Sequence, residues 1–125
     1  MDQLITIADY ERAADASLKP GAHAYFNGGA GDEITLRDNI DAWRRLAIHP
    51  RILVGVGTRD PSVTVLGRRR PHPLIVAPMA YQRLAHPEGE VATALGAQAA
   101  GAVMCLSTLA TTSVRALARG HSWSR

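Results

Sequence analysis

The chain has 125 residues, the size of one ordinary domain, and 46% of them are hydrophobic and 20% charged, which argues against disorder over most of its length. Its formal net charge of +3 comes without a basic stripe or interleaved aromatic residues, so nucleic-acid binding is not expected. The first residues lack the basic start and apolar run of a signal peptide, and no stretch has the roughly 18 apolar residues that a membrane span needs.

Cys105 is the only cysteine, so a disulfide framework is excluded. Its apolar surroundings in sequence predict a buried free thiol, and a cytoplasmic location fits such a chain. The last acidic residue is Glu90, and residues 91–125 carry only positive charges. A complete domain normally mixes both signs over its surface, so this asymmetry hints that acidic sequence once followed.

The first half of the sequence predicts helices over residues 7–18, 20–28 and 32–46. Thr6 and Asp9 resemble a capping box ahead of the first helix. Pro20 ends that helix and suits the first position of the next one. The third helix begins near Asp32, whose charge suits the positive end of a helix dipole, and its apolar residues share one face.

The pattern changes after residue 51. Residues 62–66 favour a strand, and the glycine, three arginines and Pro-His-Pro sequence that follow predict a turn or a small hairpin. Residues 74–77 are apolar on both faces, which is typical of a strand buried in a parallel sheet. Residues 87–99 predict a helix with a proline and two glutamates at its start, 102–106 a second buried strand, and 114–119 a further helix.

Strand, helix, strand and helix in this order make a βαβα pattern, which implies a parallel sheet with right-handed crossovers. Two parallel strands cannot form a covered sheet alone, and the tail 121–125 shows no third strand. The sequence therefore predicts an α/β class and the beginning of a larger fold. We divide it into an N-terminal helical segment with a small hairpin, 1–73, and two βα units, 74–125.

Four stretches of the sequence carry a resemblance to a known family. They are YFNGGAGDE at 25–33, HPRIL at 49–53, IVAPMA at 75–80 continuing into AHPEGE at 85–90, and LST at 106–108 continuing into ATTSV at 110–114. In order and spacing they resemble the FMN-dependent 2-hydroxy-acid oxidases and dehydrogenases, which include glycolate oxidase and lactate oxidase. The resemblance extends over residues 4–119.

This resemblance implies a (β/α)8 TIM barrel preceded by a helical segment, with the flavin at the carboxyl ends of the strands. Residues 74–77 and 102–106 would be the first two barrel strands, in agreement with the pattern of the sequence alone. The cofactor would be FMN. The full-length protein would act on a small-molecule 2-hydroxy acid, and we expect it to be a homo-oligomer.

The resemblance also implies individual site residues. The loop at Pro78, Met79 and Ala80 would lay its backbone against the flavin ring, which the small side chain of Ala80 permits. Ser107 would contact the polar edge of the flavin through its hydroxyl. Tyr25 would donate a hydrogen bond from its phenol to the substrate carboxylate.

The family's catalytic residues are not expected within this chain. Its histidine base, its carboxylate-binding arginine, its lysine near flavin N1 and its phosphate-binding loops come from later strands, and such a barrel needs about 250 residues. His121 and Arg125 fall past the second βα unit, at the opposite end of the barrel. Leu109 replaces an aromatic residue of some members, which leaves the preferred hydroxy acid open. We therefore expect an incomplete barrel that is inactive by itself.

The site residues also have plainer explanations. Without the family context Tyr25 is a packing or surface tyrosine, Pro78 ends a strand, and Ser107 solvates a strand end. The arginines 68–70 fit a solvated turn.

Two other motifs suggest different chemistry. His86, Glu88 and Glu90 suggest a metal site, but capping and the helix dipole explain all three, so no metal is expected. The glycine-rich segment 28–31 suggests a phosphate loop, but the acidic residues directly after it would repel a phosphate.

We expect the parent enzyme to oxidise an L-2-hydroxy acid such as lactate or glycolate, with a histidine as general base and FMN as the redox group. The alternative is a non-catalytic product, either a truncated reading frame or half of a split enzyme that needs a C-terminal partner. A flavin-dependent isomerase is a third hypothesis, and both the segment around Tyr25 and the AHPEGE run argue against it.

Overall fold

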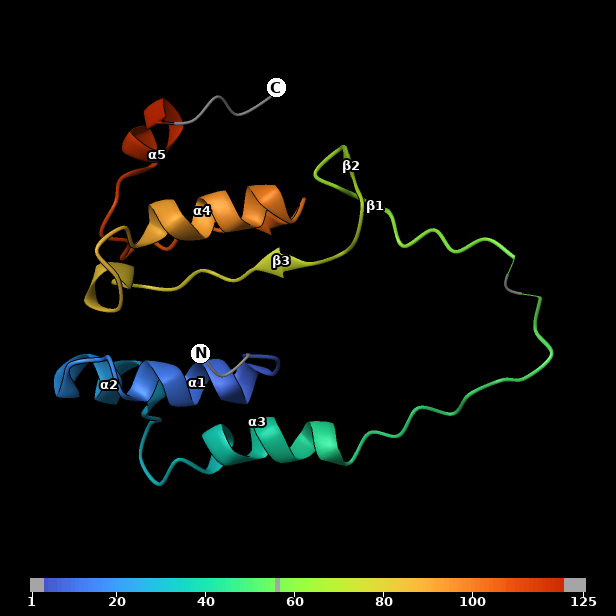
Figure 1. Cartoon of the computed structure of the whole chain (residues 1–125), viewed down its shortest axis with the longest axis horizontal. Helices are drawn as coiled ribbons and strands as arrows, with labels where there is room; N and C mark the ends of the chain where they lie inside the picture. Colours follow the sequence, from blue (N-terminus) through green and yellow to red (C-terminus); the bar gives the residue numbers. More distant parts are fainter. Residues whose placement is uncertain (1–3, 56, 121–125) are drawn as a thin grey trace. The chain divides into compact units, whose positions relative to one another are not determined.

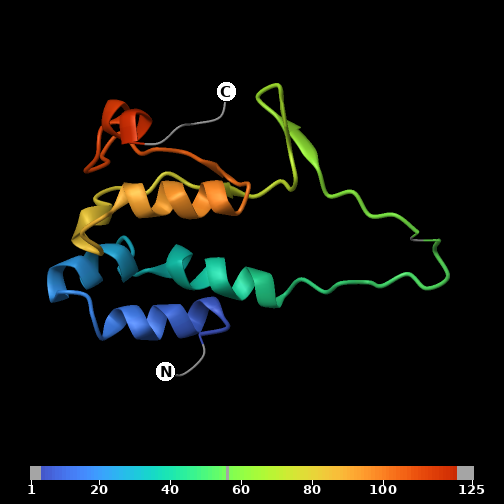
Figure 2. The ribbon, with the colours of Figure 1, turned by 45° about the horizontal axis from the view of Figure 1, so that its top comes forward.

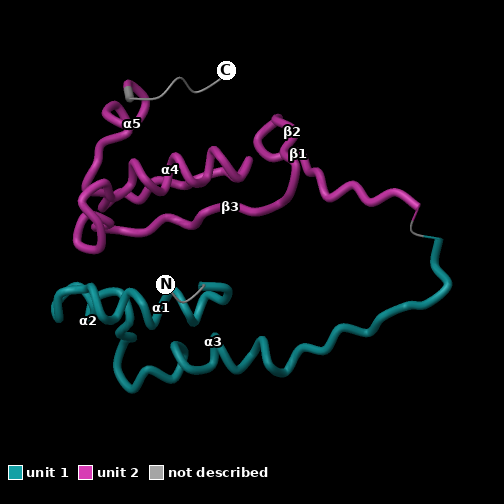
Figure 3. The backbone as a smooth tube through the Cα atoms, in the orientation of Figure 1, with its two compact units in different colours: residues 1–55 teal, residues 56–125 magenta. Residues whose placement is uncertain are grey.

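A computed structural model describes residues 4–55 and 57–120. The chain divides into two compact units, Met1–Gly55 and Val56–Arg125, each with its own secondary structure (Figures 1 and 3). The hairpin belongs to the second unit, whereas the sequence pattern grouped it with the helices. In the described ranges, no helix has both the length and the apolar character to cross a membrane.

The first unit contains the helices α1 (Ile7–Asp15), α2 (Pro20–Asn27) and α3 (Ile34–Arg44). The predicted capping box is present: Thr6 Oγ1 accepts a hydrogen bond from the amide of Asp9 at 3.2 Å, and the Asp9 carboxylate accepts one from the amide of Thr6 at 2.7 Å. α1 ends earlier than predicted because the amides of Ser17 and Leu18 both bond to the carbonyl of Ala14, which closes a turn.

α3 begins later than predicted because Glu33 adopts a left-handed backbone conformation, with φ at 57°. The predicted apolar face of this helix is largely exposed, since Ile40 and Trp43 are 58% and 75% accessible. Among residues 4–55, Ala22 of α2 is the buried apolar residue. Of these three helices, α1 has a side-chain cap, and α2 and α3 have none.

In the second unit, β1 (Val63–Val65) and β2 (Arg68–Arg70) form an antiparallel hairpin. Leu66 and Gly67 at its turn both have positive φ, 49° and 76°, as a two-residue hairpin turn with the twist of its strands requires. The predicted hairpin is confirmed, but arginines 68–70 form its second strand and not the solvated turn expected from the sequence.

The hairpin leads into β3 (Ile75–Val76), the 3-10 helix η1 (Gln82–Leu84), α4 (Glu90–Ala99), β4 (Val103–Met104) and α5 (Val114–Gly120). β3 and β4 pair in parallel, with Ile75 opposite Val103. Figure 2 shows α4 running alongside this pair. The predicted order of strand, helix, strand and helix is confirmed.

α4 begins at Glu90, three residues after the predicted start. Gly89 has φ 47° and ψ −126°, a backbone region that is open to glycine and strained for other residues. Pro87 therefore lies in the turn ahead of the helix and not in its first turn.

The apolar strands are less buried than the sequence predicts. Leu74 and Ile75 are 67% and 48% accessible, and Cys105 is exposed, so the prediction of a buried thiol is wrong. A parallel sheet is normally covered on both faces, but within residues 57–120 this sheet has two strands and forms no closed barrel. The core of the second unit consists of the small residues Ala94 and Ala97 together with Leu117.

Candidate functional site

The carboxyl ends of β3 and β4 lie at the same edge of the sheet because the two strands are parallel. The segment 77–81 follows β3, and the segment 105–110 follows β4. The amide of Tyr81 donates a hydrogen bond to the carbonyl of Leu109 at 3.1 Å, which joins the two segments directly. The structure therefore brings the predicted flavin contacts, Pro78, Met79, Ala80 and Ser107, to one edge of one unit.

Ser107 lies half-buried at the start of a turn. Its Oγ accepts a hydrogen bond from the amide of Leu109 at 3.1 Å, and its carbonyl accepts one from the amide of Ala110 at 3.1 Å. A hydroxyl that accepts one bond still has its own hydrogen to donate. Ser107 can therefore offer an O–H donor at this edge, as the resemblance implies.

The loop after β3 is exposed to solvent on one side and hydrogen-bonded to a buried side chain on the other. Pro78 and Met79 are exposed and Ala80 is half-buried. The buried side chain of Gln82 holds the loop: its Nε2 donates to the carbonyl of Met79 at 3.4 Å, and its Oε1 accepts from the hydroxyl of Thr93 at 2.6 Å. Gln82 thus ties the loop to α4.

The segment after β4 is held by Glu90, whose side chain is fully buried. Oε1 of Glu90 accepts a hydrogen bond from the amide of Thr111 at 2.7 Å, and Oε2 accepts one from the hydroxyl of Thr111 at 2.6 Å. Burial raises the pKa of the Glu90 carboxyl, but these hydrogen bonds outweigh burial and lower that pKa to about 2. Glu90 is therefore an ionised anchor for the segment that carries Ser107.

Sequence reasoning missed the roles of Gln82 and Glu90. Glu90 was explained by the dipole of α4, and its position at the first residue of that helix agrees with this. Its partner Thr111 lies 21 residues further along the chain. A signal for the role of Glu90 is present only in the motifs AHPEGE and ATTSV taken together, since one contributes the acid and the other the hydroxyl. Gln82 and its partner Thr93 lie outside both motifs.

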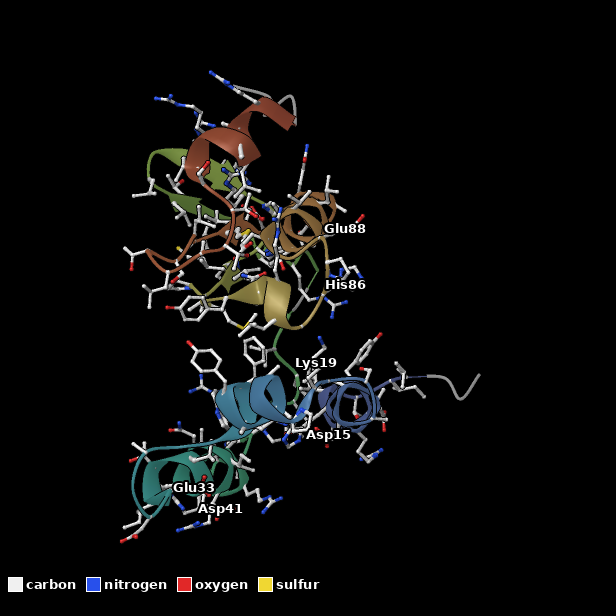
Figure 4. The ribbon with its side chains drawn as sticks, turned by 90° about the vertical axis from the view of Figure 1, so that its left-hand side faces the viewer. Asp15, Lys19, Glu33, Asp41, His86 and Glu88 are labelled. Atoms are coloured by element: carbon white, nitrogen blue, oxygen red, sulfur yellow. The ribbon has the colours of Figure 1, made fainter. Side chains whose placement is uncertain are left out.

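The residues of the suggested metal site do not converge. His86 Nδ1 accepts a hydrogen bond from the amide of Glu88 at 3.2 Å, and Glu90 is directed to Thr111. Figure 4 shows His86 and Glu88 on the outside of the turn ahead of α4, and both are exposed. In the described part of the chain, no group of three His, Cys, Asp or Glu residues could hold a metal ion.

Tyr25 lies on α2 in the first unit and is 50% accessible, with its ring at an edge-to-face distance of 5.2 Å from that of Phe26. Its role as a substrate ligand stays a prediction. The same unit contains a hydrogen bond between Nε2 of His23 and Oδ1 of Asp15 at 2.9 Å, and Figure 4 labels Asp15. His121 and Arg125 lie outside the described residues.

The edge formed by segments 77–81 and 105–110 contains no Asp, Glu, Lys, Arg or His. It can present backbone groups, small side chains and a hydroxyl to a flat ring. The half-buried Ala80 and the hydroxyl of Ser107 fit a flavin ring, because a larger side chain at position 80 would hold such a ring away from the backbone. The residues present therefore fit FMN as far as its ring is concerned.

Comparison with known proteins agrees with this geometry. Residues 14–125 match the family described as FMN-dependent dehydrogenase. The chain is 43% identical over 118 residues to glycolate oxidase 1 of Zea mays and 46% identical over 114 residues to L-lactate oxidase of a Nostoc species. These matches cover 94% and 91% of this chain, but 32% and 31% of the two relatives.

A crystal structure of mandelate oxidase matches with a TM-score of 0.87 and 38% identity, over 94% of this chain and 34% of the other. The fold is therefore α/β, and the structural neighbours are FMN-dependent TIM-barrel enzymes. The chain belongs to the FMN-dependent dehydrogenase family, and the cofactor of that family is FMN. It spans about a third of the length of the relatives that it matches.

Proposed function

We propose that this chain forms the N-terminal part of an FMN-dependent oxidoreductase that converts an L-2-hydroxy acid, similar to lactate or glycolate, to the 2-oxo acid. The observation that carries the proposal is the hydrogen bond from Tyr81 to Leu109, because it unites the two segments on which the family resemblance places the flavin. The names of the relatives, glycolate oxidase and L-lactate oxidase, support the substrate class.

Each residue has a separate task in this proposal. The backbone at 78–80 and the small side chain of Ala80 support the flavin ring, and Ser107 donates its hydroxyl hydrogen to the polar edge of the ring. Tyr25 binds the substrate carboxylate. When bound, FMN would supply the two-electron acceptor for the substrate. The general base and the phosphate site would come from parts of the fold that this chain does not span.

The test combines this chain with the C-terminal two thirds of the Nostoc L-lactate oxidase, expressed as a separate polypeptide. Retention of FMN and turnover of lactate or glycolate by the mixture are expected, with no turnover by either part alone. Turnover by the 125-residue chain alone, or a correctly folded mixture that binds no FMN, would contradict the proposal.

The variant Ser107→Ala isolates the candidate flavin contact. Loss of one polar contact is expected to weaken FMN binding by the mixture about tenfold, since about 1.4 kcal/mol corresponds to a factor of ten. Thr108→Ala is the matched control, because Thr108 is the exposed neighbour of Ser107 in the same segment. Equal FMN affinity for the two variants would remove Ser107 from the site.

A non-catalytic role is the second candidate, either as a truncated product or as half of a split enzyme. The exposure of large apolar side chains favours it, since Ile48, Leu53 and Leu66 are 94%, 101% and 93% accessible. A stable monomer with a cooperative thermal transition would argue against this candidate. Homo-oligomer formation and a cytoplasmic location stay predictions for the longer protein.

A further inference from the structure

Three polar side chains of the first unit meet where α1 and α2 face each other. Nε2 of His23 lies 2.9 Å from Oδ1 of Asp15, and Nδ2 of Asn27 lies 3.0 Å from the same oxygen. Nδ2 of Asn27 also lies 3.1 Å from Nε2 of His23. The three atoms therefore form a nearly equilateral triangle, and we call these three residues the α1–α2 triad.

The two helices position the triad. His23 and Asn27 are four residues apart on α2, so they share one face of that helix. Asp15 is the last residue of α1 and is labelled in Figure 4. The side chains of His23 and Asp15 are 41% and 44% accessible, so water and small ions can reach the triad.

Hydrogen bonds cannot satisfy all three sides of this triangle at once. If Nε2 of His23 carries a hydrogen, it donates to Asp15 and cannot accept from Asn27. If Nε2 carries none, it accepts from Asn27, and its position 2.9 Å from the carboxylate oxygen then brings two acceptors together. One side of the triangle is therefore unsatisfied in either tautomer.

A metal ion would satisfy all three sides together. A half-turn of the Asn27 amide exchanges its nitrogen and its oxygen, and the triangle then consists of one imidazole nitrogen and two oxygens. Neighbouring ligands of an octahedral ion at about 2.1 Å lie about 3.0 Å apart, whereas tetrahedral ligands at that distance lie about 3.4 Å apart. The sides of 2.9, 3.0 and 3.1 Å match one face of an octahedron.

The charge of Asp15 is available to a cation. Asp38, Asp41 and Asp60 each lie 2.8 Å from an arginine. By contrast, Asp15 has no arginine or lysine partner in the described part of the chain, although Lys19 follows it by four residues. A cation bound at the triad would therefore not compete with an existing ion pair to arginine or lysine.

We propose that the α1–α2 triad binds a divalent first-row transition-metal ion in octahedral geometry. Its ligands are Nε2 of His23, Oδ1 of Asp15 and the amide oxygen of Asn27, and water supplies the other three. The imidazole favours such an ion over Mg²⁺ and Ca²⁺, which prefer oxygen ligands. Because its third ligand is an amide, the triad is not one of the groups of three His, Cys, Asp or Glu residues that are absent from the described ranges.

The ion would act on structure and not on chemistry. None of the residues of α1 is buried, so an ion shared by Asp15 and the two α2 residues would fasten α1 to α2. α2 also carries Tyr25, the candidate substrate ligand. The inference goes beyond the proposed function and requires neither flavin nor turnover.

The test titrates the 125-residue chain, prepared without an affinity tag, with nickel chloride in a calorimeter. One Ni²⁺ is expected to bind per chain, about tenfold or more tightly than Mg²⁺. His23→Ala should weaken Ni²⁺ binding by about tenfold or more. His49→Ala and Cys105→Ser are the matched controls, because both residues are exposed and lie outside the triad, and both should leave the affinity unchanged.

A gain of affinity at position 27 distinguishes metal binding from a loss of folding. Asn27→Asp replaces the amide oxygen with a carboxylate and is expected to bind Ni²⁺ about tenfold more tightly than the parent chain. Without metal, this variant places two carboxylates side by side and should melt at a lower temperature than the parent chain. Ni²⁺ should then raise its melting temperature by more than it raises that of the parent chain.

A second variant replaces Asn27→Asp if circular dichroism shows that it does not fold. Asn27→His places two histidines four residues apart on one face of α2, an arrangement that binds such ions, so the same gain is expected.

Three results would overturn the proposal. One is equal Ni²⁺ affinity for His23→Ala and His49→Ala, and another is a folded variant at position 27 that binds Ni²⁺ no more tightly than the parent chain. The third is equal affinity of the parent chain for Ni²⁺ and Mg²⁺. None of these measurements involves FMN, so a failure of the proposed function would leave this inference standing.

Discussion

Glu90 and Thr111 form a closed pair in which one buried carboxylate accepts both the amide hydrogen and the hydroxyl hydrogen of the same residue, at 2.7 and 2.6 Å. The pair connects the first residue of α4 with the segment between β4 and α5. Both bonds involve an ionised acceptor, and such bonds are stronger than those between neutral groups.

Removing the hydroxyl of this pair should be costly. Thr111→Val deletes one charge-assisted bond but keeps the amide, so it is expected to lower the free energy of unfolding by about 1.5–3 kcal/mol. The exposed residue Thr108 of the same segment provides the control, since Thr108→Val should change stability by less than about 0.5 kcal/mol. Urea unfolding followed by circular dichroism measures both. Equal urea midpoints for the parent chain and Thr111→Val would show that the hydroxyl bond does not stabilise the fold.

The same pair predicts a dependence on pH. The pKa of Glu90 is about 2 in the folded chain, compared with an ordinary value of 4.5. Its stabilising contribution is therefore complete above about pH 4.5 and is lost as the pH falls from there toward 2. The stability difference between the parent chain and Glu90→Gln should be large at pH 6 and shrink over this window. In an NMR titration, the chemical shift of the Thr111 amide should change near pH 2. A change near pH 4.5 would contradict the role of Glu90 as an ionised hydrogen-bond acceptor.

Gly89 and Gly96 should respond oppositely to alanine. At Gly89, φ is 47°, and an added Cβ would lie 2.7 Å from Cγ of Arg83 and 3.2 Å from its backbone nitrogen. Gly89→Ala should therefore destabilise the chain by about 1–3 kcal/mol. At Gly96, inside α4, nothing lies within 4 Å of such a Cβ, so Gly96→Ala should stabilise by about 0.5–1 kcal/mol. Thermal melts distinguish the two, and effects of the same sign would refute the backbone argument.

Gln82 and Thr93 are expected to be energetically coupled. Gln82→Met leaves the hydroxyl of Thr93 without its acceptor and should lower the free energy of unfolding by about 1–3 kcal/mol. In a double-mutant cycle with Thr93→Val, the coupling energy should be about 0.5–3 kcal/mol. Gln98 is exposed and lies on α4, as Thr93 does, so Gln98→Met is the control substitution. Purely additive effects at Gln82 and Thr93 would mean that the 2.6 Å contact is not a stabilising bond.

The capping box should set the stability of α1. Thr6→Ala removes the side chain that accepts from the Asp9 amide and should cost about 0.5–2 kcal/mol in the stability of this helix. Thr35→Ala, at an exposed position inside α3, should instead be neutral or slightly favourable because alanine has the higher helix propensity. Carbon chemical shifts of the two helices report both effects. An α1 that keeps its helicity in Thr6→Ala would contradict the cap.

The sequence predicted those features that depend on neighbours along the chain. Thr6 and Asp9 are three residues apart, so their capping box can be recognised in the sequence. The hairpin is recognisable because Gly67 stands between a β-branched run and the arginines. The β3–α4–β4 order follows from the change in hydrophobic period.

Burial and long-range contacts could not be predicted in the same way. Leu74 and Ile75 are apolar, and the sequence alone therefore predicts that they are buried. Their burial depends on packing partners beyond this two-stranded sheet, which sequence periodicity does not specify. Glu90 meets Thr111 only after α4 and β4 have folded back on each other. The predicted flavin contacts lie at one edge, whereas Gln82 and Glu90, which hold that edge, have no sequence motif of their own.

The exposure of Cys105 has a practical consequence. Because it is the single cysteine of the sequence and lies two residues before Ser107, a maleimide dye would label the chain at one known position near the candidate flavin edge. Bound flavins absorb blue light, so a blue-emitting dye at this thiol would be quenched by energy transfer as FMN binds. The molecule thus provides its own attachment point for an optical titration that needs no turnover.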